Sequence, residues 1–114
     1  MKHSALEMTL LYDYYGELLT EKQQTCFDLY YNQDLSLAEI AEEAGISRQG
    51  VHDSLARAEA ALLTMEEKTG CVARQRLQQQ SLDTICRAAE QLLAIPGAQA
   101  LAKDILGAAA QMKE

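Results

Sequence analysis

Apolar residues recur every three or four positions along most of the chain, a spacing that predicts amphipathic helices. The clearest pair lies in residues 35 to 63. Ser36 and Glu39 have the spacing of a capping box, so we expect the first helix of the pair to begin here. Its apolar face is expected to comprise Leu37, Ile40, Ala41 and Ala44. Gly45 favours the left-handed backbone conformation that ends many helices, which leaves this helix little more than two turns.

Ser47 is expected to cap the second helix, which runs from Arg48 to Lys68 and would be about 30 Å long. Its inward residues alternate four and three apart: Val51, Leu55, Ala58, Leu62 and Met65. A short helix, a glycine and a second helix that follows at once predict a helix-turn-helix motif, whose second helix can enter a DNA major groove. An ordinary helical hairpin is the alternative reading of the same pattern.

The segment before this pair is predicted to form two more helices. Capping boxes at Ser4 with Glu7 and at Thr20 with Gln23 place their starts, and the helices extend to about positions 19 and 31. The first is expected to bury Leu6, Leu10, Leu11, Tyr14 and Leu18. Tyr12 and Tyr15 flank this face, and their hydroxyls are expected to remain in water. The second is expected to bury Cys26, Phe27 and Tyr30.

Gly70 ends the long helix, and a helical tail follows. Helices are predicted over residues 72 to 94 and 98 to 112, with Pro96 and Gly97 between them. The inward face of the first comprises Leu77, Leu82, Ile85, Cys86, Ala89, Leu92 and Leu93. That of the second comprises Leu101, Ile105, Ala108 and Met112. We therefore divide the chain into a helix-turn-helix domain, residues 1 to 70, and a tail, residues 71 to 114. The tail is expected to cover the far half of the long helix or to form a homodimer, which we favour.

Composition excludes several classes of protein. The chain has 114 residues, of which 48% are hydrophobic, and its one proline and lack of β-branched runs predict an all-α fold. No stretch approaches the roughly 20 apolar residues of a membrane span, and no signal peptide is apparent, so we expect a cytoplasmic protein. Three cysteines and two histidines form no metal-ligand motif, so we expect no metal and no cofactor. No catalytic motif is present, which argues against an enzyme.

Charge is distributed unevenly between the two parts. Residues 1 to 70 carry five Lys and Arg against thirteen Asp and Glu, so five minus thirteen gives minus eight, whereas residues 71 to 114 carry five against four. Nonspecific affinity for DNA comes mainly from Lys and Arg that displace counterions, commonly at about 6 to 10 phosphates. The part with the helix-turn-helix pattern is therefore expected to bind DNA poorly on its own.

The candidate contact residues lie near the start of the long helix. They are Ser47, Arg48, Gln49, His52, Asp53 and Arg57. Arg48 could pair with guanine, Gln49 with adenine, and Ser47 could hold a phosphate. Asp53 is unfavourable next to phosphates, and a solvated helix face is the alternative reading for the whole set.

A resemblance to region four of bacterial sigma factors is carried by LLTEKQQTCFDLYYNQDLSLAEIAEEAGISRQGVHDSLARAEAAL. A closer one, to the YlxM family of small bacterial proteins, is carried by LYDYYGELLTEKQ, LYYNQDLSLAEIAEE and SRQGVHDSL, and covers about residues 6 to 95. It implies a sigma region four-like helix-turn-helix bundle with a C-terminal helical extension. It also implies a role in the signal recognition particle pathway, with a component of the particle or its GTPase as partner. Gly50 and His52 depart from the Ala and Tyr that the family leads us to expect.

Two functions follow as hypotheses. The first, which we favour, is a non-enzymatic regulatory or adaptor protein that uses its acidic helix-turn-helix for protein or ribonucleoprotein contacts. The second is a sequence-specific, DNA-binding transcriptional regulator that reads bases through Arg48, Gln49 and His52, with dimerisation adding phosphate contacts.

Overall fold

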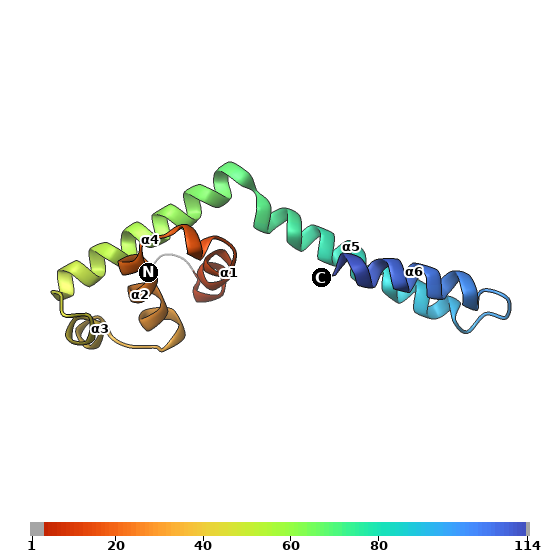
Figure 1. The fold of residues 1–114 in the computed structure, drawn as a ribbon, viewed down its shortest axis with the longest axis horizontal. Helices are drawn as coiled ribbons and strands as arrows, with labels where there is room; N and C mark the ends of the chain where they lie inside the picture. The colour runs from red at the N-terminus through yellow and green to blue at the C-terminus, as the bar shows by residue number, and fades with distance from the viewer. Residues whose placement is uncertain (1–3, 114) are drawn as a thin grey trace. The chain divides into compact units, whose positions relative to one another are not determined.

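The computed structural model describes residues 4 to 113, and this part of the chain is built from helices and turns without a strand (Figure 1). The elements are α1 (Ala5–Tyr15), the 3-10 turn η1 (Gly16–Leu18), α2 (Glu21–Phe27), the π-helical turn η2 (Asp28–Asn32), α3 (Leu37–Ala44), α4 (Arg48–Thr69), α5 (Cys71–Leu92) and α6 (Gln99–Met112). The all-α prediction is confirmed. The chain separates into two compact units, which we call the helix-turn-helix unit (Met1–Val72) and the hairpin unit (Ala73–Glu114).

Side-chain caps fix where the helices begin. Thr20 with Gln23 and Ser36 with Glu39 form the predicted capping boxes, with all four hydrogen bonds between 3.0 and 3.2 Å. The Ser36 amide donates to the Glu39 carboxylate, which lowers the pKa of that carboxyl. At Ser4 only half of the predicted box forms. Its Oγ accepts from the Glu7 amide at 3.0 Å, so Ser4 is a simple N-cap.

The inward face of α1 differs from the prediction. Leu6, Tyr14 and Leu18 are exposed, with 71%, 49% and 71% of their surface in solvent. The buried residues of this helix are Met8, Leu11 and Tyr15. Apolar residues occupy most sides of this helix, so its own periodicity does not determine which side is covered.

The first of two hydrophobic clusters lies where α1 and α2 pack on α4. Its buried members are Met8, Leu11, Tyr15, Leu19, Phe27, Ala58, Leu62 and Val72. Phe27 is fully buried and stacks between two tyrosines, with ring centroids 4.3 Å from Tyr12 and 4.4 Å from Tyr31. Helices α1 and α2 cover Ala58 and Leu62, and Val72 and the partly buried Cys71 also pack on this cluster.

The second cluster holds the helix-turn-helix together. It comprises Cys26, Leu29, Ile40, Ala41, Val51 and Leu55. Val51 and Leu55 come from the first half of α4, whereas the first cluster uses its second half. Helix α4 is long because it contributes buried residues to both hydrophobic clusters, one after the other along its length.

A buried tyrosine joins α1 to the end of α4. Tyr15 is only 4% exposed, and its hydroxyl donates to Glu66 Oε1 at 2.7 Å and lies 2.6 Å from Thr69 Oγ1. The expectation of a solvated hydroxyl is wrong. Glu66 Oε1 also accepts from the Val72 amide at 3.0 Å, so one carboxylate serves both α1 and the first turn of α5. Gly70, with φ of 62°, is the left-handed residue that ends α4.

A contact of the half-buried Tyr31 makes the free energy of unfolding depend on pH in the alkaline range. The Tyr31 hydroxyl donates to Glu59 Oε2 of α4, and burial, followed by this hydrogen bond, raises the pKa of its phenol. The unfolded chain releases this proton near pH 10, whereas the folded chain retains it. Above about pH 10 the folded state therefore binds more protons than the unfolded state, and the free energy of unfolding falls as the pH rises.

We expect the unfolding temperature, followed by circular dichroism, to fall between about pH 9.5 and pH 11 and to fall less steeply in Tyr31→Phe. Some slope should remain, because burial also raises the pKa of Tyr12 and of Tyr15. Parallel pH profiles for the two proteins would contradict the assignment to Tyr31.

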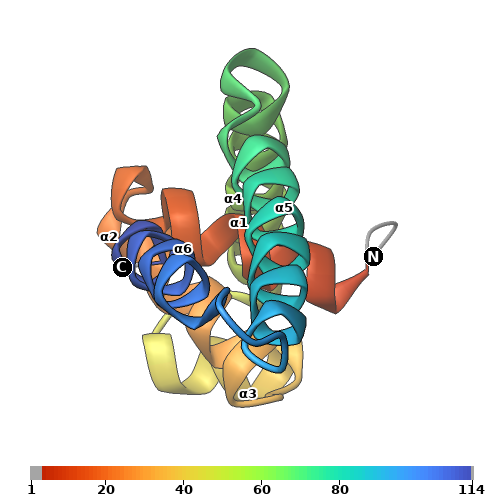
Figure 2. The ribbon, with the colours of Figure 1, turned by 90° about the vertical axis from the view of Figure 1, so that its right-hand side faces the viewer.

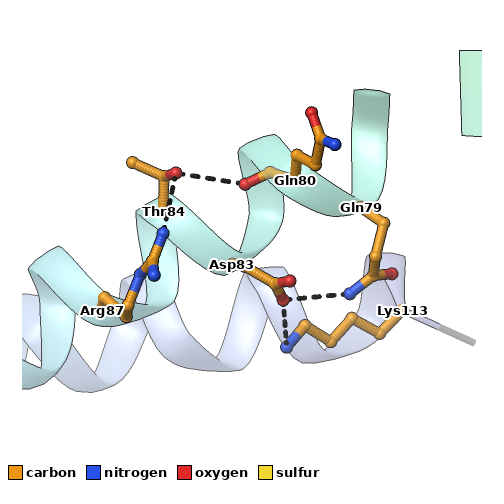
Figure 3. A network of polar contacts seen from close by, with 6 residues as sticks. All are labelled: Gln79, Gln80, Asp83, Thr84, Arg87 and Lys113. Atoms are coloured by element: carbon orange, nitrogen blue, oxygen red, sulfur yellow. Dashed lines mark hydrogen bonds and ion pairs between the residues drawn. The ribbon is translucent and has the colours of Figure 1, made fainter. Parts of the chain in front are cut away.

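The hairpin unit is formed by α5 and α6, which lie side by side and antiparallel (Figure 1 and Figure 2). Gly97, with φ of 87°, lies in the turn between them, as the sequence predicted. The buried positions are Leu82, Ala89, Ala102 and Ala109. Asp83 of α5 pairs with Lys113 at 3.7 Å and accepts from Gln79 at 3.0 Å, in the polar network of Figure 3.

The expected inward face of α6 is wrong by one residue. Leu101, Ile105 and Met112 remain 66%, 38% and 59% exposed, while the small residues Ala102 and Ala109 face α5. Leu77 and Ile85 of α5 were also expected to be buried and are 64% and 45% exposed. The hairpin therefore closes on small side chains and leaves larger apolar side chains uncovered within this unit.

Candidate partner-binding surface on the helix-turn-helix

Helices α3 and α4 meet at a tight turn in which local chemistry fixes the geometry. Gly45 adopts φ of 71°, and the amides of Gly45 and Ile46 both donate to the carbonyl of Ala41, at 3.0 and 3.1 Å. Ser47 Oγ then accepts from the Gly50 amide at 2.9 Å and starts α4. Ala41 and Val51 are buried in the seam, which orients the start of α4 outward.

All six candidate contact residues are exposed to solvent. Ser47, Arg48, Gln49, His52, Asp53 and Arg57 all belong to α4 or its cap. Val51 and Leu55 of the same helix are buried at the seam. The surface can thus contact a macromolecule without any change in the fold.

Asp53 engages two of the other candidates. Gln49 Nε2 donates to Asp53 Oδ1 at 2.9 Å, and His52 Nδ1 lies 3.7 Å from the same oxygen. The Asp53 carboxylate therefore accepts a hydrogen bond from the Gln49 amide that would otherwise donate to adenine, and it lies beside the His52 imidazole. Sequence reasoning placed these residues together but missed the hydrogen bond, although Gln and Asp four apart on a helix are a known stabilising pair.

Exposed acidic side chains lie on α3, the other helix of the motif. Glu42 and Glu43 of α3 are exposed, and residues 1 to 70 have a net charge of minus eight, five cations against thirteen carboxylates. Lys22 and Arg57 line one cavity of about 290 Å³ beside α4, which Asp53 also lines. Lys22 comes from α2, and the fold places it at the same cavity as Arg57 of α4.

Residues 4 to 113 contain no group of three or more His, Cys, Asp or Glu side chains placed to hold a metal ion. None of the helices in this stretch combines the length and the apolar character needed to cross a bilayer.

The fold and this surface define a helix-turn-helix protein. The chain belongs to the family described as "Putative helix-turn-helix protein, YlxM / p13 like", which matches residues 2–95. The resemblance seen in the sequence is confirmed.

Bacterial relatives extend over most of the same length. The UPF0122 protein of Thermoanaerobacter sp. strain X514 is 51% identical over 90 residues, which cover 79% of this chain and 77% of the relative. That of Caldanaerobacter subterraneus subsp. tengcongensis is 49% identical over 85 residues, 75% and 73% of the two chains. That of Acetivibrio thermocellus is 56% identical over 66 residues, 58% and 56% of the two chains.

Proposed function

We propose that this protein is a non-enzymatic regulatory adaptor whose helix-turn-helix unit binds a basic protein or ribonucleoprotein surface. The observation that carries the proposal is the acidic character of the exposed side of α3 and α4, where Glu42, Glu43 and Asp53 accompany Arg48 and Arg57. Such a surface attracts a cationic partner at long range and repels the phosphates of bare nucleic acid. The resemblance to the YlxM family supports a component of the signal recognition particle, or its GTPase, as that partner.

The first experiment measures affinity for the purified protein component of the signal recognition particle assembled on its RNA, at several salt concentrations. Binding should weaken as salt increases. The double variant Glu42→Gln and Glu43→Gln removes two exposed charges of α3 and should weaken binding about tenfold, since an exposed charge pair contributes up to about 1 kcal/mol. These positions lie outside the capping box of Ser36 and Glu39, so the fold should be retained.

The matched control places the same charge change in the hairpin unit. Glu90→Gln with Asp104→Asn removes two exposed carboxylates from α5 and α6 and should leave the affinity unchanged within about twofold. Equal loss in both double variants would indicate a general charge effect and not a surface on α3 and α4. Failure of the wild-type protein to bind any particle component at low salt would overturn the choice of partner.

The alternative function is a transcriptional regulator that reads DNA. It is favoured by the exposed Arg48 and Gln49 at the start of α4, where a groove-reading helix carries its base contacts. A mobility-shift assay at low salt on random and genomic DNA separates the two functions. The adaptor should give no shift. A shift that is lost in Arg48→Ala and strengthened in Asp53→Asn would favour the regulator, because removing the Asp53 charge reduces repulsion of phosphates.

A further inference from the structure

The hairpin unit has one side without any charged residue. The residues of α5 that face α6 are Leu82, Cys86 and Ala89, spaced four and three apart, and Leu93 continues this row just after the helix ends. On α6 the corresponding residues are Ala102, Leu106 and Ala109. The row of residues one position earlier on each helix has the same spacing. We call these two outer rows the apolar face; it consists of Ser81, Ile85, Ala88, Leu92, Leu101, Ile105, Ala108 and Met112.

The two outer rows lie on the same side of the hairpin. Each row precedes its buried row by one residue, and therefore turns away from the contact by the same angle in its own helix. Because α5 and α6 are antiparallel and face each other, equal turns bring both rows to one side (Figure 2). The rows one residue later contain Asp83, Arg87 and Lys103, and the network of Figure 3 includes the first two.

We propose that a second copy of this chain docks on the apolar face, so that two hairpins form an antiparallel four-helix bundle. Ile85, Leu101, Ile105 and Met112 are 45%, 66%, 38% and 59% exposed in the hairpin unit by itself. No charge on this face offers a complement to a nucleic acid or to a strongly charged protein. The surface that complements this face is another uncharged apolar face of the same size and spacing. In a dimer with twofold symmetry, the second copy of the chain presents such a face.

The size of the face fits a reversible dimer. Residues 81 to 92 extend for about 17 Å at 1.5 Å per residue, and two helices side by side are about 20 Å wide. Two such faces would bury on the order of 1,000 Å² of accessible surface in total, near the lower limit of specific interfaces. Ala88 and Ala108 are small enough to let the helices of the two copies approach closely. The size of the face therefore predicts a dimer with a dissociation constant in the micromolar range. The small residues predict the close helix packing that is typical of the core of a four-helix bundle.

The net charge of the hairpin also permits self-association. Residues 71 to 114 carry five basic and four acidic residues, a sum of plus one, whereas residues 1 to 70 carry minus eight. Two copies that meet through their hairpins therefore bring together their nearly neutral parts. Pairing through the helix-turn-helix units would instead bring two strongly acidic surfaces together.

The test is sedimentation equilibrium of the full chain from about 2 to about 200 µM, a range that brackets a micromolar dissociation constant. The wild-type mass should rise from near 12.6 kDa towards twice that value. The double variant Ile85→Lys and Ile105→Lys should remain monomeric throughout, because pairing would bury four lysines. Its helicity and unfolding temperature, followed by circular dichroism, should remain close to those of the wild type, since both positions are exposed in the hairpin.

The matched control is Gln80→Lys with Ala110→Lys, which adds the same charge on exposed positions of the same two helices away from the apolar face. It should dimerise within about threefold of the wild type. The milder Ile85→Ala with Ile105→Ala provides a second check should the lysine variant unfold, and it should weaken dimerisation about tenfold or more. A wild-type monomer at 200 µM, or equal dimerisation of the apolar-face variants and the control, would overturn the proposal. Because these substitutions leave α3 and α4 unchanged, failure here would not affect the adaptor function.

Discussion

Replacing Phe27 by alanine should lower the free energy of unfolding of the helix-turn-helix unit by about 4 kcal/mol. Phe27 is fully buried and is the last residue of α2. Its loss would leave a cavity in the first cluster and would remove two stacked ring contacts, with Tyr12 and with Tyr31. Aromatic pairs add about 0.5 to 1.5 kcal/mol each beyond the area that they bury, which places this substitution at the upper end of the range.

Urea denaturation followed by circular dichroism at 222 nm measures this change. Leu18→Ala is the control, because it also truncates a large apolar side chain in the same unit but at a position that is 71% exposed. Its effect should be about 0.5 kcal/mol or less. Similar losses in the two variants would mean that Phe27 and its two stacked tyrosines contribute no more than an exposed leucine.

Replacing Glu66 by alanine should destabilise the same unit by about 2 kcal/mol. Its Oε1 accepts hydrogen bonds from the Tyr15 hydroxyl and from the Val72 amide. Hydrogen bonds to a charged group contribute more than those between neutral groups, and the buried Tyr15 hydroxyl would lose this acceptor. The substitution therefore loosens both the contact of α1 with α4 and the first turn of α5.

Glu67→Ala is the matched control, since Glu67 is the adjacent residue of α4, has the same charge and is exposed. It should change the free energy of unfolding by less than about 0.5 kcal/mol. Hydrogen exchange should report the same difference locally. The amide of Val72 should exchange faster in Glu66→Ala and at the wild-type rate in Glu67→Ala. Unchanged protection in both variants would contradict the role of the Glu66 carboxylate.

The ends of the helices could be predicted because they depend on local chemistry. The caps at Thr20, Ser36 and Ser47, and the left-handed glycines Gly45 and Gly70, lie where the sequence places them. Each needs only residues within one turn, so a linear pattern contains the necessary information. The π-helical turn Asp28–Asn32 was not predicted, since the sequence pattern there is that of a continuous helix.

The buried side of a helix depends on its neighbours and was predicted less well. Helix α6 has two adjacent rows of apolar residues, either of which could have faced α5. The row with Ala102 and Ala109 is the buried one, because its small side chains allow the two helices to come close. In α1 apolar residues surround most of the helix. The contact of α1 with the far half of α4 joins residues some 50 positions apart in sequence, and no periodicity reports such a pairing.

The exposure of the candidate contact residues could be predicted from the sequence, but the contacts that Asp53 makes with Gln49 and His52 did not follow from the motif. Which residues face outward from α4 is fixed by the seam residues Val51 and Leu55, and that periodicity is visible in the sequence. The cavity lined by Lys22 and Arg57 could not be predicted from the sequence, because its lining residues come from both α2 and α4.

The position of Asp53 also bears on how such proteins can diverge. The Asp53 carboxylate accepts a hydrogen bond from the Gln49 amide and lies beside the imidazole of His52. It also adds a negative charge among the exposed residues of α4. Its replacement by alanine would free the side chains of Gln49 and His52 from this carboxylate and would remove one negative charge, without changing Val51 or Leu55 at the seam. A single substitution at position 53 therefore changes both the charge and the hydrogen-bonding groups that the start of α4 presents to solvent.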